Sequence, residues 1–254
     1  MPGILIKWLA DHLSFSKKVN FSEVLWLSLG ENCLPDDILN RHGLKGFSTP
    51  YSNGRSNLDY ALNLEKINYS GLIQIENLAY GISDKKKVVR STLINQCDPI
   101  YNEMHMRGFE MTHHDIIGSD KARESFERKI QRQLEVRGKK NIVFLYLHRI
   151  NKNSDLDSIF SKAQEFSKIY TRGKFSCTVI VFSQKIIPAD EARKVCYRKI
   201  SKHIHFFEFH THMLWGGTDN DIFFARIDDD LIKKMLDVSA KIIKSGRYIN
   251  DGFL

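Results

Sequence analysis

Long apolar runs in the second half of the chain constrain the fold more than any other feature. They cover residues 141–147, 175–182 and 203–209, and apolar side chains dominate each of them. A strand that is apolar on both sides belongs in a sheet whose two faces are covered, which is the usual setting of parallel strands. An earlier run at 24–29 has the same character. We therefore expect a mainly parallel sheet of four to six strands.

Helical patterns separate the apolar runs. From 119 to 138, apolar residues recur every three or four positions, with Ser119 placed to cap the helix and Gly138 to end it. Alternating strands and helices of this kind build a three-layer α/β/α fold, with helices on both faces of the sheet. The same criteria predict helices at 154–173 with Ser154 as the cap, at 188–196 and from 229 to near Gly246, and a further strand at 221–227.

Residues 44–112 interrupt this alternation. The segment begins with a loop rich in Ser, Pro, Asn and Gly between residues 48 and 57, and short helical patterns follow. An irregular segment of this length inside one domain commonly forms a lid or a binding wall. We expect a single α/β domain, residues 1–254, in which 44–112 form a lid or substrate wall after the first strand–helix unit.

Composition narrows the location and the partners. The four cysteines are far apart and lack C-x-x-C spacing, which favours free thiols in a reducing compartment. No apolar run reaches membrane-spanning length, so we expect a cytoplasmic protein without a membrane span. The net charge of +8 favours an anionic small molecule, glycan or peptide as substrate. No nucleic-acid-binding module is recognisable, so no specific nucleic-acid partner is expected.

The first apolar run ends in a turn that carries a cysteine. Residues 24–33 read VLWLSLGENC, so the run stops at Gly30 and places Cys33 at the expected start of a helix. Free N–H groups at a helix start carry partial positive charge, which favours thiolate over thiol. Asn32 and the neighbouring N–H groups are donors of the kind that stabilise an oxyanion. Cys33 is therefore the candidate nucleophile, although a small apolar residue at a strand–helix junction would look the same.

A nucleophilic thiol needs a base, and the chain offers several histidines. His113, His114 and Asp115 bring two imidazoles next to a carboxylate. Adjacent side chains point to different sides, so one histidine is expected to face Cys33; we favour His114, with Asp115 to orient it. The histidine spacing matches no zinc pattern, so no metal site is predicted. The alternative bases or orienting groups are His113, His148, His212 and Asp219.

The loop at 210–221 has the composition of a ligand-binding loop. Trp215 offers a flat apolar wall, and Gly216 lets a ligand approach the backbone closely. A tight turn before another strand is an equally good interpretation. The predicted substrate-binding residues are Gly30, Tyr51, Trp215 and Gly216.

These segments resemble a bacterial family of putative papain-like cysteine peptidases, a domain of unknown function often seen beside glycan-biosynthesis enzymes. The resemblance covers roughly residues 22–235 and implies Cys33 as nucleophile and His114 as base. Where the family pattern tends to Pro-Phe-Asp-Trp, this chain has Pro-Tyr-Ser-Asn at 50–53, so the aspartate has no counterpart unless Asp59 replaces it. The segments that carry the resemblance are 27–33, 47–62, 113–115, 141–147 and 214–217.

The resemblance leaves the reaction open. Papain is not a doubly wound parallel sheet, so the fold expected here follows the alternating pattern of strands and helices. The position of the nucleophile, after the first strand of such a sheet, is also similar to its position in SGNH hydrolases and in cysteine-containing, coenzyme A-binding enzymes of capsule polysaccharide biosynthesis. This similarity is weaker, and it does not fix function.

The leading hypothesis is a cysteine enzyme with a thioester intermediate, a hydrolase or peptidase when water accepts the acyl group. One alternative is an acyltransferase that modifies a surface glycan with a coenzyme A-type donor. The other is a non-catalytic protein that binds an anion or a glycan.

Overall fold

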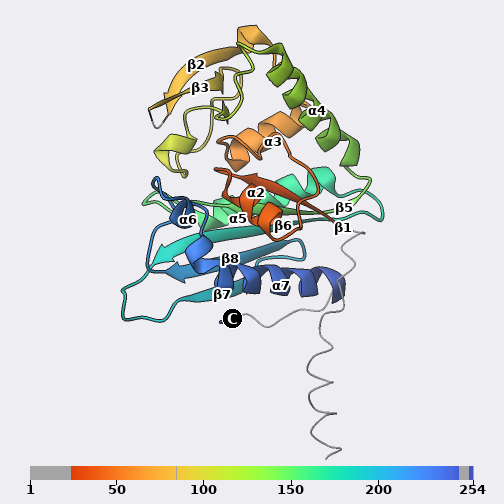
Figure 1. Cartoon of the computed structure of the whole chain (residues 1–254). Helices are drawn as coiled ribbons and strands as arrows, with labels where there is room; N and C mark the ends of the chain where they lie inside the picture. Colours follow the sequence, from red (N-terminus) through yellow and green to blue (C-terminus); the bar gives the residue numbers. More distant parts are fainter. Residues whose placement is uncertain (1–23, 84, 246–251, 254) are drawn as a thin grey trace, which may run out of the picture.

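A six-stranded, mainly parallel sheet forms the centre of the computed structural model, which describes residues 24–83, 85–245 and 252–253 (Figure 1). Its strand order is β1-β5-β6-β8-β7-β9; the first four strands run parallel, whereas β7 is antiparallel to its neighbours. The predicted three-layer α/β/α fold is therefore confirmed. The strands are β1 (Val24–Gly30), β5 (Asn141–Leu147), β6 (Cys177–Ile186), β7 (Lys194–Lys199), β8 (Ile204–Thr211) and β9 (Gly252–Phe253).

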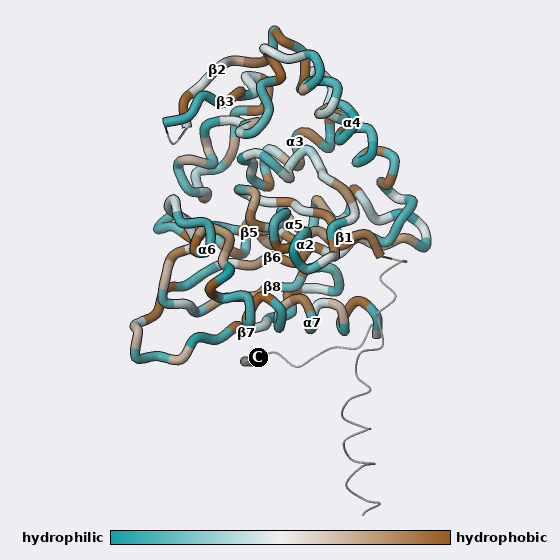
Figure 2. Tube along the Cα trace, in the orientation of Figure 1, coloured by the Kyte–Doolittle hydropathy of each residue, from teal (hydrophilic) through white to brown (hydrophobic). Residues whose placement is uncertain are grey.

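Helices cover both faces of this sheet, which explains why its strands are apolar on both sides. In β1, Leu27 and Leu29 belong to one buried cluster, and Trp26, the residue before Leu27, belongs to the other. Figure 2 shows hydrophobic residues along the central strands. The first cluster includes α3 (Leu58–Lys66), α4 (Asp120–Val136) and α5 (Leu156–Tyr170); the second includes α2 (Leu34–Arg41) and α7 (Asp229–Ser245).

Two helix starts show how the local sequence sets the boundaries. Ser119 caps α4 as predicted, and its hydroxyl accepts the N–H of Ala122 at 3.2 Å. The predicted cap of α5 is wrong: Asp155, not Ser154, is the cap, because its carboxylate accepts two N–H groups of the first turn. The predicted end of the last helix at Gly246 lies outside the described residues. Within the described ranges, no helix is both long and apolar enough to cross a membrane.

Two predicted elements are wrong. The segment 188–196 is not a helix; its last three residues begin β7, where Val195 and Tyr197 are buried at strand spacing and pair with β8. The segment 221–227 is not a strand, because Asp219 accepts the N–H groups of Asp221 and Ile222 and turns the chain into a helix. The elements formed there are α6 (Asn220–Phe223) and the 3-10 helix η4 (Arg226–Asp228).

The inserted segment 44–112 contains more strand than expected. Besides α3, it forms a small antiparallel sheet with the order β2-β3-β4, which lies with α4 at the top of Figure 1. The buried Glu110 carboxylate links two parts of this segment, because it accepts hydrogen bonds from Arg90 at 2.6 Å and from Arg55 at 3.4 Å. The elements are η2 (Ile75–Asn77), β2 (Leu78–Ser83), β3 (Lys86–Ser91), η3 (Glu103–His105) and β4 (Glu110–Met111).

Candidate active site at the carboxyl edge of the sheet

Cys33 lies at the predicted place, as the N-terminal cap of α2, and is partly exposed. Burial raises the pKa of its thiol above the ordinary value. The N–H of Cys33 and the charge of Arg55 act to lower it, whereas Asp36 and Asp37 raise it further. The helix start alone favours the thiolate, but here burial and two carboxylates in the first turn outweigh it. The resting thiol is therefore protonated at neutral pH.

The turn before Cys33 is closely packed and leaves one donor without a partner. A Cβ on Gly30 would lie 3.0 Å from Pro35 Cγ and 3.3 Å from the backbone nitrogen of Leu147. Asn32 is buried, and its Oδ1 accepts the N–H of Leu34 at 3.0 Å, whereas its Nδ2 has no hydrogen-bond partner. A buried amide donor without a partner is unusual in a folded protein.

The predicted base, His114, contacts a lysine. Nε2 of His114 is 2.8 Å from Nζ of Lys129, and burial together with Lys129 lowers the pKa of His114 to about 4. Asp115 accepts from Tyr80 and from the N–H of Gly118 rather than from His114. Among the described residues, no hydrogen bond joins the Cys33 sulfur to a histidine ring. His113 is exposed.

The other predicted residues have structural contacts of their own. His212 is exposed and lies 2.8 Å from the carbonyl oxygen of Glu191, and Asp219 caps α6. Tyr51 is buried in the core, where its hydroxyl contacts that of Tyr69 at 2.8 Å. Among the described residues, no cluster of three or more His, Cys, Asp or Glu side chains has the arrangement of a metal site.

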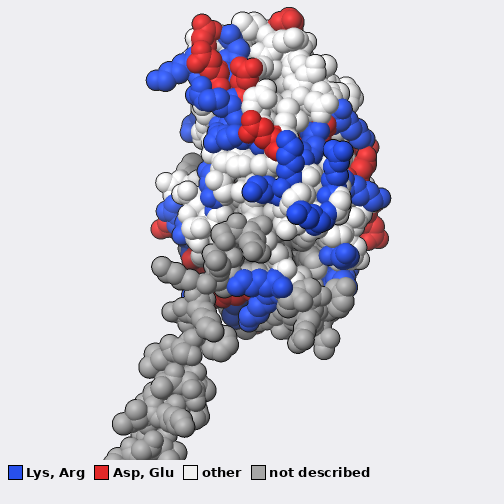
Figure 3. Space-filling view, turned by 90° about the vertical axis from the view of Figure 1, so that its right-hand side faces the viewer, with Lys and Arg blue, Asp and Glu red and all other residues white. Residues whose placement is uncertain are grey.

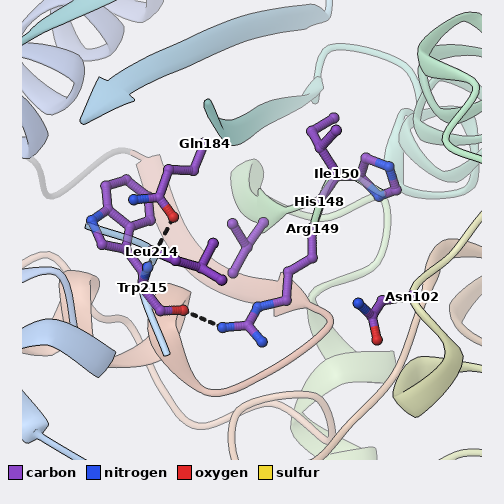
Figure 4. A pocket seen from close by; sticks show the side chains of 8 residues that line it. Asn102, His148, Arg149, Ile150, Gln184, Leu214 and Trp215 are labelled. Atoms are coloured by element: carbon purple, nitrogen blue, oxygen red, sulfur yellow. Dashed lines mark hydrogen bonds between the residues drawn. The ribbon is translucent and has the colours of Figure 1, made fainter. Parts of the chain in front are cut away.

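A cavity of about 90 Å³ opens where β5 and β6 end. Arg149 donates to the carbonyl oxygen of Trp215, and the N–H of Trp215 donates to Gln184 at 2.9 Å (Figure 4). Two predicted residues, His148 and Trp215, thus line the same cavity, and a Cβ on Gly216 would lie 3.4 Å from the Arg149 guanidinium. The lining residues are Asn102, Leu147, His148, Arg149, Ile150, Gln184, Leu214 and Trp215.

A buried carboxylate, Glu31, links the ends of β1 and β5, and the sequence analysis missed it. Glu31 is fully buried and accepts from the Tyr146 hydroxyl at 3.1 Å, from the N–H of Arg149 at 3.1 Å and from Nδ1 of His148 at 2.7 Å. Burial acts to raise its pKa, but His148, His105 and the N–H of Arg149 lower it below the ordinary value. Glu31 is therefore ionised. The only available signal was its position at the carboxyl end of an apolar strand.

Further polar groups around Glu31 are buried without hydrogen-bond partners. Both ring nitrogens of His105 are unpartnered, and its Nε2 lies 3.9 Å from the Glu31 carboxylate. Burial lowers the pKa of His105 to about 4, so the ring is neutral at pH 7. The hydroxyl of Tyr101, whose ring packs against His148, is also buried without a partner. His105 lies in the inserted segment, so no local pattern placed it at this edge.

The fold and this edge define a three-layer α/β protein with a thiol, an unpartnered amide and a buried carboxylate–imidazole pair at the carboxyl ends of its parallel strands. A family model described as putative papain-like cysteine peptidase (DUF1796) matches residues 24–185, more than half of the chain. The protein belongs to this family, whose description places it at a coarse level among cysteine hydrolases. No curated protein and no solved structure matches the chain significantly.

Proposed function

We propose that the protein is a cysteine hydrolase that works through a thioester intermediate, with Cys33 as its nucleophile. The observation that carries the proposal is a partly exposed thiol at the start of α2 next to the unpartnered Nδ2 of Asn32. When the sulfur attacks an acyl carbon, negative charge develops on the carbonyl oxygen, and a preplaced amide donor stabilises it. Water then releases the acid and regenerates the thiol.

The proton of the thiol has to pass to a base, and we propose His105 for this step. Its ring is neutral and has no hydrogen-bond partner. The charge of Arg55 lowers the pKa of the Cys33 thiol and of the His105 and His113 rings, which indicates that all three groups lie near this cation. Glu31, 3.9 Å from His105, takes the orienting role in this proposal. His114 remains the second candidate, because the family resemblance implies it although Lys129 occupies its Nε2.

We further propose that the inserted segment 44–112 forms the substrate wall. Arg55, Asn102 and His105 all come from this segment, and each lies at or near the carboxyl edge of the sheet. The backbone of Arg55 pairs with that of Glu110, which fixes this part of the loop to the small sheet. The wall therefore contributes side chains to the site as well as covering it.

The charge of the surface supports an anionic substrate. Lys and Arg side chains gather around α4 on the face shown in Figure 3. Such a surface raises the local concentration of anionic molecules, and salt weakens the effect. An anionic small molecule, an acidic glycan derivative or an acidic peptide is the proposed substrate. The exposed basic residues of α4 and the turn after it are Lys121, Arg128, Arg132, Lys139 and Lys140.

The test is a cleavage screen of the whole protein with peptide and thioester substrates that differ in charge. Cys33→Ala should lower kcat/KM for any cleaved substrate by about 10³-fold or more, because the nucleophile is removed. Cys97→Ala is the matched control, since Cys97 is also a partly exposed free thiol. Unchanged cleavage in Cys33→Ala would contradict the proposal. Binding of an anionic glycan without cleavage of any substrate would support the non-catalytic alternative instead.

A further inference from the structure

A second group of residues at this edge has the geometry of a serine triad. Oγ of Ser154 lies 3.0 Å from Nε2 of His148, and Nδ1 of His148 lies 2.7 Å from the Glu31 carboxylate. The two contacts use opposite nitrogens of the ring. A neutral His148 with its proton on Nδ1 donates to Glu31 and leaves the lone pair of Nε2 for the serine hydroxyl. This is the tautomer that a serine nucleophile requires of its base.

The base and its orienting group are held rigidly. Glu31 and His148 are fully buried, and the Tyr146 hydroxyl and the N–H of Arg149 hold the carboxylate in place. The ring of Tyr101 packs edge-on against His148, with 6.0 Å between ring centroids. Because rotation of the imidazole would break several contacts, its orientation toward the serine is preorganised.

Ser154 is free of the capping role that its sequence position suggests. Asp155 caps α5, and the Ser154 side chain turns toward His148 instead. Its Oγ also accepts the N–H of Asn151 at 3.0 Å, and the carbonyl oxygen of Ile100, at 3.4 Å, is a more distant second acceptor for its one proton than Nε2 of His148. These contacts fix the hydroxyl, and the residue remains partly exposed.

The cavity next to this group can hold a small acyl group. His148 lines it, and Figure 4 shows Asn102 on the same side as His148, with Arg149 toward the middle. Its volume of about 90 Å³ corresponds to a few water molecules. The guanidinium of Arg149 favours an acyl group that carries a polar or anionic substituent. The hydroxyl of Tyr101, whose ring packs against His148, is buried without a partner, and such a group is normally satisfied by a ligand or water.

We propose that Ser154, His148 and Glu31 form a second hydrolytic centre, which acts on small acyl esters independently of Cys33. Oγ of Ser154 bonds to the acyl carbon while its proton passes to Nε2 of His148. The bond to the leaving alcohol then breaks, and the alcohol takes that proton. Water, deprotonated by the same nitrogen, attacks the acyl-serine ester, which releases the acid and restores the serine hydroxyl.

An alkyl fluorophosphonate tests this proposal on the whole wild-type protein, with the modified peptide mapped by mass spectrometry. The expected result is one adduct on Ser154, formed with release of fluoride. Cys33→Ala should be labelled at the wild-type rate, and His148→Gln about 100-fold more slowly, because the base is lost. Ser158→Ala is the matched control, since Ser158 is a partly exposed serine one turn further along the chain and should not affect labelling.

Labelling of the wild-type protein does not depend on whether a variant folds. An adduct on another residue, or no adduct at all, would overturn the proposal and would identify the Ser154–His148 contact as structural. Neither result would bear on Cys33, because thioester formation at Cys33 is measured separately.

Discussion

Replacing Glu31 by alanine tests the buried network that the proposed Cys33 site shares with the proposed Ser154 site. The substitution removes the acceptor of three donors, from Tyr146, His148 and Arg149, all within 3.1 Å of the carboxylate. A buried donor left unpaired costs about 1–3 kcal/mol. Loss of one partner from a buried charged network typically costs about 3–5 kcal/mol, and we expect Glu31→Ala to lower the free energy of unfolding by roughly that amount. Glu31→Gln keeps one acceptor oxygen, so its cost should be about 1–3 kcal/mol.

Urea unfolding monitored by circular dichroism measures these differences. Glu76→Ala is the control, because Glu76 is an exposed glutamate in the inserted segment and should change stability by less than about 0.5 kcal/mol. A cost below about 1 kcal/mol for Glu31→Ala would refute the reasoning, since it would mean that water replaces the carboxylate without loss.

The pH dependence provides a second check on the same variant. The pKa of Glu31 is lower in the folded protein than its ordinary value of 4.5. Its stabilising contribution is therefore fully present above about pH 4.5 and is lost as the pH falls through the lower folded value. The stability difference between wild type and Glu31→Ala should therefore shrink as the pH falls below about 4.5.

Three other predictions concern the Cys33 side of the site. Because burial raises the thiol pKa and Arg55 opposes it, Arg55→Gln should shift the pH profile of Cys33 alkylation by iodoacetamide to higher pH; an unchanged profile would show that this cation does not act on the thiol. Gly30→Ala should cost about 1–3 kcal/mol in urea unfolding, since its Cβ would contact backbone at 3.3 Å, and a neutral effect would mean that the turn adapts. His105→Gln should lower kcat by about 10²-fold or more, whereas His114→Gln should leave it nearly unchanged; the opposite order would return the base to His114.

The sequence predicted those parts of the fold that depend on local pattern and on burial. Continuous apolar runs identified β1, β5, β6 and β8, because a strand covered on both faces needs apolar side chains on both sides. The prediction of a helix at 188–196 was wrong because an apolar residue such as Val195 is compatible with the inner side of a helix and with a buried strand position. Only the pairing with β8 decides between them, and a single sequence does not reveal pairing.

In the site, too, the residues set by local sequence were predictable and those set by distant contacts were not. The turn from Gly30 to Cys33 was predictable, because it follows directly from a strand end and a helix start. Glu31 was overlooked because a charged residue beside a glycine turn is usually exposed, and it is buried here only because β5 supplies its donors. His105 lies in the inserted segment, and the course of that segment brings it close to Glu31. No periodicity in the sequence predicts this course.

The most direct measurement of the central claim is the mass of the protein after reaction with a cleavable acyl substrate and acid quenching. We predict an added acyl group on the peptide that contains Cys33, sensitive to hydroxylamine as a thioester is, and a more persistent oxygen ester when Cys33→Ser is used. Turnover of the substrate with no acyl group on Cys33 at any time, and full activity in Cys33→Ala, would contradict the assignment of this cysteine as the nucleophile.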